Sequence, residues 1–520
     1  MRSIYLDHAA TTPLAPEAYE ALRPWLLEHY GNPASDHAFG RLARQAVERA
    51  RAQVAALLGA STEEILFTSG ATEANNLALK GALEFRGLEG AHVVSSRTEH
   101  KCVLDSLRYL ETRGLKLTWL KPDAGGVVSA DAVLAALTPA TALVSLMWVN
   151  NELGSINQVE RLAPLLRERG VLFHVDAVQA VGKLPINLAE LPIDLLSMSA
   201  HKIYGPKGVG ALFVRKRPRA RLTPQLHGGG HEQGMRSGTL APHQIVGMGE
   251  AFRLAGERLP GDASHYAGLR QRLWARLSAL ERIWRNGSEA GAPHILNVSF
   301  EGVEGEALRA MLPELMVSSG SACSSATREP SYVLRALGRD DALANASLRF
   351  SFGRANTEAE IDAAAARVIE AVLWLREING EPAAERPAAV PAAEKENVFA
   401  YPDAVWQTFL KAAGKAGRFP EDGASLISLK AESRATGSSL GLQLRLRADG
   451  RVAEARFQAL GCPVGIAVGA WLAAWAPGKT LAELRTLKLA DLHQALEIPE
   501  DKLHCGLMGE DLFRQLPPPT

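Results

Sequence analysis

The sequence predicts an α/β fold with a mostly parallel central sheet, followed by two smaller α+β regions. From Leu14 to about Ala255, short apolar runs alternate with amphipathic helical patterns, which is typical of strand–helix–strand units. After that point, longer helical patterns and isolated strands replace the alternation. A segment rich in proline, alanine and glutamate then separates the last part of the chain. These observations predict a large domain, a small domain and a C-terminal domain.

The composition is typical of a soluble globular protein. Of the 520 residues, 47% are hydrophobic and 22% are charged, and Lys+Arg equal Asp+Glu at 57 each. Because no net charge remains, we expect neither nucleic acid nor an anionic membrane as a partner. The start shows no signal-peptide pattern, and no apolar run is long enough to cross a bilayer. The few cysteines argue against a disulfide framework and for a reducing cytoplasm; they are Cys102, Cys323, Cys462 and Cys505.

Seven apolar runs within residues 15–255 predict the strands of the large domain. Each is bounded by turn residues, as expected of a buried strand. Amphipathic patterns at 41–59 and 159–170 predict helices that cover the sheet. The expected strands are 64–69, 92–96, 115–120, 142–149, 171–177, 194–200 and 210–214.

Residues 256–378 predict the small α+β domain, and we expect the N-terminal segment 1–14 to pack against it. The expected helices are 269–284, 305–315 and 357–378, and the expected strands are 295–302 and 347–352.

Residues 379–397 predict a linker, because three prolines, six alanines and four glutamates cannot bury a core. Residues 398–520 then predict a separate α+β domain. Its expected helices are 404–417, 463–476, 480–487 and 489–497, and its expected strands are 441–450 and 452–461.

Lys202 is the first candidate functional residue. It follows the strand 194–200, at the position where open α/β sheets bind ligands. A lysine that loses water there has a lowered pKa, which leaves an amine able to condense with an aldehyde. Lys202 is therefore a candidate to carry pyridoxal phosphate (PLP) as a Schiff base. The alternative is a solvated lysine beside a glycine-rich turn.

Two other strand ends could complete such a site. Residues 69–72 join a strand to a helix, and the free N–H groups of Ala71 and Thr72 would suit a phosphate. His100 follows another strand, where its ring could stack on a pyridine ring and move protons. An ordinary helix cap and a core histidine are the alternatives.

Two more strands end in polar side chains. Asp176 could keep a pyridine nitrogen protonated, and Gln179 is near enough in sequence to reach a ring hydroxyl. Asn150 and Asn151 could bind a ring oxygen or a carboxylate. Helix capping for Asp176 and turn formation for the asparagines are the alternatives.

Three later segments could also act on a ligand. The glycine-rich loop 227–239 could close over a phosphate that is bound by a neighbouring subunit. Cys323 lies in a run of small residues, 318–331, which is typical of a reactive thiol. Arg349, within a strand, could bind a substrate carboxylate with both guanidinium nitrogens. A flexible loop, an incidental thiol and a salt-bridged arginine are the alternatives.

Taken together, the motifs of residues 1 to about 378 resemble the cysteine desulfurases of the iron–sulfur-cluster and nitrogen-fixation type. These are PLP enzymes of aminotransferase class V with the fold type I of PLP-dependent transferases, and they work as homodimers. The sequence departs from the common pattern at Trp148, where histidine is frequent, and at Ala200, where glycine is common. The motifs are YLDHAATTP, FTSGATEANN, TEHK, VNNE, HVDAVQ, SAHKIYGPKG, HGGGHEQGMRSGT, SSGSACSS and LRFSFGR.

The resemblance implies a role for each candidate. Lys202 is the Schiff-base lysine, Asp176 the partner of the ring nitrogen, His100 the stacking acid and base, and Gln179 the partner of the ring hydroxyl. Asn151 and Arg349 hold cofactor and substrate, and Cys323 accepts the sulfur. The phosphate is bound by Ala71, Thr72, Ser199 and His201, with Thr239 added by the partner subunit.

The C-terminal domain is similar to iron–sulfur scaffold proteins, which use three cysteines, a histidine and an acidic residue. Cys462, His504 and Cys505 match that set, but Thr436 to Ser438 stand where the first cysteine is expected. Since a tetrahedral site needs four ligands, an iron–sulfur cluster or zinc would require another one, for which Cys323 is a candidate. A degenerate interaction domain is the alternative.

The implied function is a desulfurase that converts L-cysteine to L-alanine and keeps the sulfur as a persulfide on Cys323. The C-terminal domain would then be an acceptor or docking module for that sulfur, held near by its tether. Iron–sulfur scaffolds and other sulfur-acceptor proteins are the implied partners. A selenocysteine lyase of the same fold and a non-catalytic platform for cluster assembly or metal carriage are the alternatives.

Overall fold

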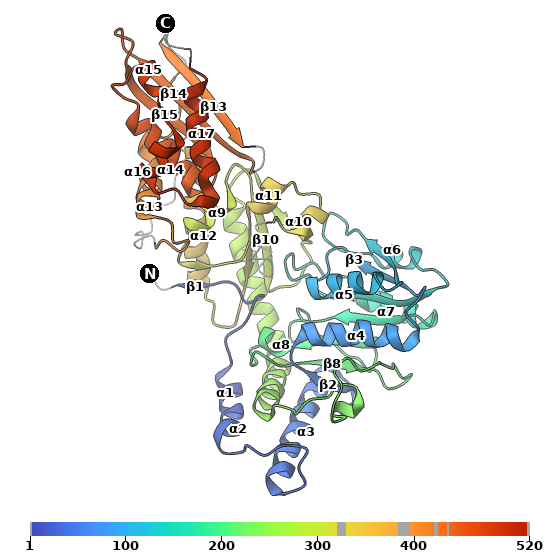
Figure 1. Ribbon diagram of the computed structural model, residues 1–520. Helices are drawn as coiled ribbons and strands as arrows, with labels where there is room; N and C mark the ends of the chain where they lie inside the picture. Colours follow the sequence, from blue (N-terminus) through green and yellow to red (C-terminus); the bar gives the residue numbers. More distant parts are fainter. Residues whose placement is uncertain (1–2, 320–328, 383–395, 421–424, 434–435, 517–520) are drawn as a thin grey trace.

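The computed structural model describes residues 3–319, 329–382, 396–420, 425–433 and 436–516 (Figure 1). Its largest element is a seven-stranded sheet in the order β2-β8-β7-β6-β5-β3-β4, parallel except that β8 runs antiparallel to both of its neighbours. All seven strands fall on the seven predicted runs, which confirms the α/β class with a mostly parallel sheet. The strands are β2 (Ile65–Thr68), β3 (His92–Ser96), β4 (Lys116–Leu120), β5 (Thr141–Met147), β6 (Leu172–Asp176), β7 (Leu195–Ser199) and β8 (Gly210–Val214).

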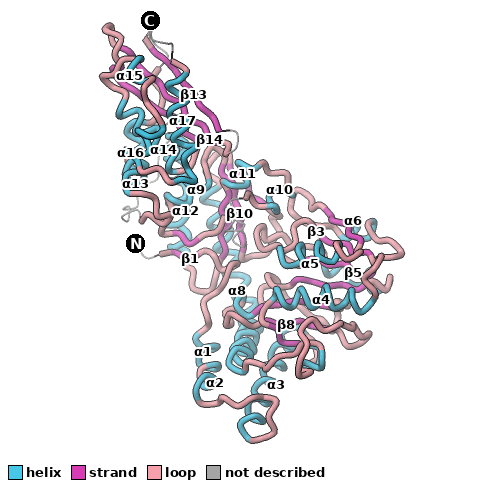
Figure 2. Tube along the Cα trace, in the orientation of Figure 1, coloured by secondary structure: helices cyan, strands magenta, loops and turns pink. Residues whose placement is uncertain are grey.

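Helices cover both faces of this sheet (Figure 2). One face packs against α3 (Ala38–Leu58), α6 (Ala130–Ala135), α7 (Val159–Glu168) and the first half of α8 (Pro242–Leu277). The other packs against α4 (Ala71–Arg86) and α5 (Lys101–Glu111). Since both faces are buried, the strands read as continuous apolar runs, and their carboxyl ends meet at one edge.

The small domain is joined to the large one by α8, a continuous helix that passes through the boundary expected near residue 255. Its antiparallel sheet has the order β12-β10-β9. Its elements are β9 (Ile283–Asn286), β10 (Ile295–Phe300), α9 (Gly305–Ala310), β11 (Leu315–Met316), α10 (Tyr332–Ala336), α11 (Asp341–Asn345), β12 (Ser347–Ser351) and α12 (Glu358–Ile378). The N-terminal strand β1 (Ile4–Tyr5) pairs in parallel with β11.

The helix predicted at 269–284 is wrong at its end. It stops at Leu277, and Ile283–Asn286 forms β9, whose residues pair with β10 from Asn297 to Phe300. The periodicity of this stretch suits a helix, but the edge of β10 offers backbone partners that a longer helix would leave unpaired.

The C-terminal domain packs helices on one antiparallel sheet of order β13-β14-β15. β13 (Leu426–Ser433) and α17 (Leu503–Arg514) were not predicted, whereas the other main elements were. These are α13 (Asp403–Leu410), β14 (Ser438–Leu446), β15 (Val452–Leu460), α14 (Pro463–Trp475), α15 (Leu481–Leu484) and α16 (Leu489–Leu496).

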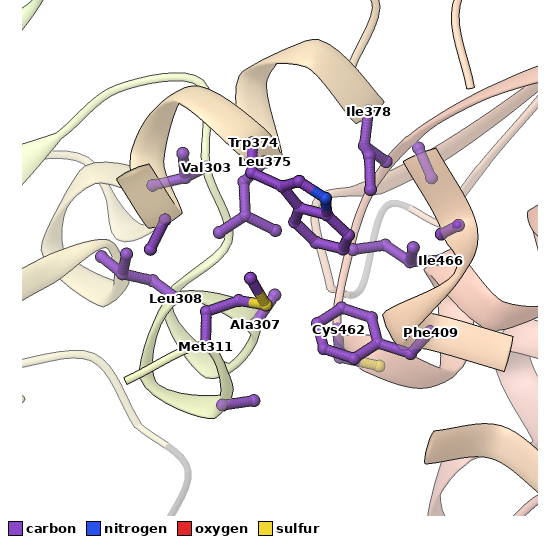
Figure 3. Packing of buried hydrophobic residues seen from close by; sticks show 14 of the residues in the cluster. Val303, Ala307, Leu308, Met311, Trp374, Leu375, Ile378, Phe409, Cys462 and Ile466 are labelled. Carbon is purple, nitrogen blue, oxygen red and sulfur yellow. The ribbon is translucent and has the colours of Figure 1, made fainter. Parts of the chain in front are cut away.

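The C-terminal domain and the small domain share one continuous apolar core. Figure 3 shows Met311 and Ala307 of the small domain facing Phe409 and Cys462 across the boundary. The rings of Trp374 and Phe409 meet edge to face, with centroids 5.3 Å apart. The C-terminal domain is therefore packed onto its neighbour, although a linker joins the two in sequence. No helix within the described ranges is long and apolar enough to cross a membrane.

Candidate active site

A cavity of about 610 Å³ lies where the carboxyl ends of the large-domain strands meet the N-terminal segment and the small domain. It brings together almost all of the residues predicted to hold a cofactor and a substrate. Its walls include Ala71, Thr72, His100, Asn151, Asp176, Gln179, Ser199, His201, Lys202 and Arg349.

Lys202 ends a short 3-10 turn, Ala200–Lys202, that directly follows β7. Its Nζ donates to the carbonyl oxygens of Ala9 (2.7 Å) and Ala10 (2.6 Å), so the N-terminal segment forms part of the site. Gly205 is required close by, since a Cβ there would lie 2.8 Å from the Cβ of Ala200. This turn aims the lysine amine at the cavity.

A second amine lies beneath the first. Nζ of Lys183 donates to the carbonyl oxygen of Lys202 at 2.8 Å. Burial, together with the charge of Lys202, lowers the pKa of Lys183 to about 7. Lys183 was not predicted, because no sequence motif marks it.

His201 is held neutral at physiological pH. Burial and the nearby charges of Lys202, Lys207 and Lys183 lower its pKa to about 4. Its Nδ1 lies 3.1 Å from Oγ1 of Thr11. It can therefore bind an anion only through a neutral N–H group.

Ala71 and Thr72, which are predicted to bind an anion, form the first turn of α4 and line the cavity. Gly70 caps the helix, and Gly210 of β8 must lack a side chain because a Cβ there would lie 2.8 Å from the Cα of Gly70. The helix has sixteen residues, and the first N–H groups of such a helix have no partner within it.

Glu73 lies in the same turn, and its negative charge is compensated by hydrogen-bond and ion-pair partners. It accepts from the N–H of Ser69 (2.8 Å) and pairs with Arg236 of the loop 227–239 (2.7 Å). Burial opposes its ionisation, but these hydrogen bonds outweigh burial and lower its pKa. The loop is thus tied to the helix through an ion pair that the sequence did not reveal.

Asp176 is buried at the end of β6, and both carboxylate oxygens have a partner. Oδ2 accepts from Nδ2 of Asn75 at 2.8 Å, and Oδ1 accepts from the N–H of Val178 at 3.1 Å. Three residues on, Gln179 donates through Nε2 to the carbonyl oxygen of Ala9 (2.9 Å) and contacts His294 through Oε1 (3.2 Å).

His100 caps α5. Its Nδ1 accepts from the N–H of Cys102 at 3.2 Å and lies 3.0 Å from Sγ of the same residue. Glu99, directly before it, is fully buried, and its Oε2 has no partner among the described residues. Burial raises the pKa of Glu99 well above its usual range, which favours the protonated form. Glu99 was missed, although a carboxylate between a strand and a helix is a usable signal.

Arg349 enters the cavity from β12 of the small domain. Its Nη2 pairs with Oδ1 of Asp7 at 2.7 Å, and its Nη1 donates to the carbonyl oxygen of Asn151 at 2.9 Å. Its Nε has no partner within the described part of the chain. Asn150, by contrast, is a turn residue, since its Oδ1 accepts from the N–H groups of Glu152 and Leu153.

Among the described residues, one predicted site residue does not line the cavity. Thr239 is exposed and does not line it. Cys323 lies outside the described residues.

The C-terminal candidates Cys462, His504 and Cys505 do lie together. Sγ of Cys462 is 3.7 Å from Sγ of Cys505, and Nε2 of His504 is 3.4 Å from the latter. A hydrogen bond from Cys505 lowers the pKa of Cys462 against its burial, and the pKa of Cys505 is raised in turn. Within the described ranges, no group of three or more His, Cys, Asp or Glu side chains could hold a metal ion.

The chain matches two known families. Residues 4–364 match the family described as Aminotransferase class-V, and residues 400–515 match the NifU-like N terminal domain. The chain is 54% identical over 378 residues to the cysteine desulfurase IscS of Methylococcus capsulatus, and 54% identical over 380 residues to that of Azotobacter vinelandii. Each match covers 72% of this chain and 94% of the relative.

Solved structures are similar over the same part of the chain. A NifS-like protein is 37% identical, with a TM-score of 0.66 over 71% of this chain and 98% of its own. A structure described as SspA in complex with cysteine is 39% identical, with a TM-score of 0.61 over 67% and 98%.

Proposed function

The chain belongs to the aminotransferase class V family and to the cysteine desulfurases within it, and on that premise we propose a role for each group at the cavity. The reaction is the conversion of L-cysteine to L-alanine, in which Cys323 retains the sulfur as a persulfide. One observation carries the assignment of roles. An amine, a buried carboxylate, a helix N-terminus and an arginine, each from a different element, line the same cavity.

The donor set of this cavity fits PLP. The cofactor carries an aldehyde, an anionic phosphate and a basic ring nitrogen, and the cavity offers an amine, helix N–H groups and a carboxylate. Lys202 would hold the aldehyde carbon, Asp176 the ring nitrogen, and the phosphate would be bound by Ala71, Thr72, Ser199 and His201. When bound, PLP withdraws electrons from the α-carbon of the substrate amino acid.

The remaining cavity residues would orient the ring. His100 would stack on it. Nε2 of Gln179 keeps a second N–H beyond the one bonded to Ala9, and that N–H would reach the ring oxygen. Asn151 would contact both ring and substrate, since its backbone is fixed by Arg349.

Arg349 would bind the carboxylate of L-cysteine, because its guanidinium is fixed by Asp7 and Asn151 and still has an N–H to give. Lys202 and His100 would take the proton from the α-carbon and return protons to the product. Sγ of Cys323 would attack the substrate sulfur as its bond to carbon breaks. The thiol and L-cysteine thereby become a persulfide and L-alanine, with no external oxidant.

We also infer a homodimer. Large exposed apolar side chains gather on the N-terminal helices α1 (Pro16–Leu22), α2 (Pro24–Leu27) and α3, a surface that a second copy could cover. Exposed Thr239 would then complete the phosphate site of the partner subunit. The apolar residues are Tyr19, Leu26, Leu27, Tyr30, Phe39 and Leu42.

Mixing two inactive variants tests the shared site. If Thr239 acts across the dimer, Lys202→Ala and Thr239→Ala subunits should regain part of the activity when refolded together. Light scattering should give twice the chain mass. A monomer, or no gain on mixing, would refute the shared site.

The C-terminal domain is proposed as the acceptor or docking module for the sulfur in iron–sulfur cluster assembly. The match to a NifU-like domain and the close pair Cys462 and Cys505 support this role. The free thiols and the sparse cysteine usage support a cytoplasmic location. A selenocysteine lyase would use the same residues and is separated by a preference for the selenium substrate.

The direct test is alanine release from L-cysteine by the holoenzyme. Cys323→Ser should retain the PLP absorbance and lose alanine release on the order of 10³-fold, because the thiol nucleophile is gone. Lys202→Ala should lose both the covalent cofactor and the activity. A wild-type chain that carries no PLP and releases no alanine would instead be the non-catalytic platform.

A further inference from the structure

The two groups expected to contact the PLP ring, Asp176 and His100, are joined by side chains that have no assigned role. Asn75 lies on α4 and Cys102 on α5, and both line the cavity. Asn75 is fully buried. We propose that Asn75 and Cys102 are positioning residues that fix the carboxylate of Asp176 and the ring of His100 as one unit. This inference rests on the proposed function.

The amide of Asn75 bridges the two sides. Its Nδ2 donates to Oδ2 of Asp176 at 2.8 Å and to Sγ of Cys102 at 3.2 Å. A primary amide nitrogen carries two hydrogens, so both bonds form at once. Since the N–H of Val178 donates to the other oxygen of Asp176, the carboxyl group is held in place through both of its oxygens.

The orientation of the amide is set by its surroundings. Oδ1 of Asn75 has no hydrogen-bond partner among the described residues. Turning the amide over would place that oxygen against the carboxylate of Asp176, so that two acceptors would face each other. The observed orientation therefore serves the two Nδ2 bonds, and through them the cavity.

Cys102 passes the constraint to His100. Because Sγ of Cys102 accepts from Asn75, its S–H hydrogen is available for Nδ1 of His100, 3.0 Å away. The backbone N–H of Cys102 points to the same Nδ1. A nitrogen that accepts two hydrogens carries none of its own, so the neutral imidazole has its proton on Nε2.

The same helix relates this unit to the phosphate site. Ala71 and Thr72 lie in the first turn of α4, and Asn75 lies one turn later. A rigid helix thus sets the separation between the phosphate-binding N–H groups and the partner of the ring nitrogen.

The test measures PLP affinity and the absorbance spectrum of the holoenzyme. Asn75→Ala should raise the dissociation constant of PLP about tenfold or more, since a hydrogen bond to a carboxylate is lost. It should also change the pH dependence of the bound-cofactor absorbance. Asn76→Ala is the matched control, because Asn76 lies on the same helix but bonds to Thr72 and Ser106 instead.

A pair of variants at Cys102 isolates the link to His100. Cys102→Ser retains a donor to Nδ1 and should match the wild type within about twofold, whereas Cys102→Ala should shift the absorbance titration as Asn75→Ala does. The double variant Asn75→Ala/Cys102→Ala should be no worse than Asn75→Ala alone, because the two act in series.

The outcomes separate this inference from the proposed function. Should the wild type bind PLP and release alanine while Asn75→Ala equals Asn76→Ala, only the positioning role is refuted. The positioning role is also refuted if Cys102→Ala and Cys102→Ser give the same absorbance titration. This comparison of the two Cys102 variants tests the positioning role even if Asn75→Ala does not fold. Failure of the wild type to bind PLP refutes the proposed function itself.

Discussion

The cavity and the C-terminal domain each place a cysteine beside a histidine, but in opposite surroundings. Cys102 and His100 line an open cavity among ionised groups. Cys462 and Cys505 are only 6% and 1% exposed, and Cys462 packs against the small domain (Figure 3). The first arrangement admits a small substrate, whereas the second excludes one. If these thiols accept sulfur as proposed, they must first become accessible, and we expect the contact between the two domains to control that access.

Polar contacts also join the two domains. Glu306, in the first turn of α9, accepts from Nζ of Lys502 at 2.6 Å and from the hydroxyl of Tyr401. Both donors belong to the C-terminal domain, and the side chain of Lys502 is 7% exposed. A largely buried pair of this kind is costly to break on one side only.

The largest expected effect tests the open, charged character of the cavity. Arg349→Lys retains the charge but loses the planar fork that binds a carboxylate. We expect kcat/KM for L-cysteine to fall about 100-fold, chiefly through KM, in steady-state assays of alanine release. PLP absorbance is the control for an intact cavity. A value within threefold of the wild type would contradict the assignment of Arg349 to the substrate.

A smaller effect is expected on the labelling rate of the buried thiols in the C-terminal domain. Glu306→Ala leaves Lys502 buried without this carboxylate, so the domain contact should open more often and maleimide labelling of Cys462 should speed up about tenfold. Glu168→Ala on α7, exposed and in the large domain, is the matched control. Fast labelling of Cys462 already in the wild type would show that the domain contact does not seal the pair.

The same contrast explains what the sequence could predict. The seven strands of the large sheet were readable because both sheet faces are buried, and most of the cavity residues because they lie at or just after the end of a strand. Asn75, Glu99 and Lys183 were missed because their contacts are with residues distant in the chain. β13 was missed because only Leu429 and Ala431 of this edge strand are buried, which weakens its pattern.

The domain contact was also beyond the sequence. Met311, Trp374 and Phe409 each read as the core of their own element, and nothing in their spacing says that they share one cluster. An amphipathic pattern identifies the buried face of a helix but not the element that covers it. The linker composition therefore suggested a loosely tethered C-terminal domain, whereas in the structure this domain packs against the small domain.

The smallest expected effect concerns the buried charge beneath the cavity. The pKa of Lys183 is lowered from 10.5 to about 7 in the folded chain, chiefly by burial. Between these values the unfolded chain binds a proton that the folded chain does not. The stability cost of Lys183 is therefore absent above pH 10.5, grows as the pH falls and is complete below pH 7.

Lys183→Met removes that cost but also the hydrogen bond to the carbonyl of Lys202, so the two changes partly cancel. We expect the PLP-free chain to gain about 1 kcal/mol in free energy of unfolding at pH 7, measured by urea titration, with the gain gone at pH 10. Met leaves the neighbouring charge of Lys202 in place, so a gain that stays constant with pH would mean that Lys183 is not the titrating group. In that case Lys183 would not be a destabilising buried charge next to Lys202. The burial of Cys462 and Cys505 would then remain as the main difference between the C-terminal domain and the cavity.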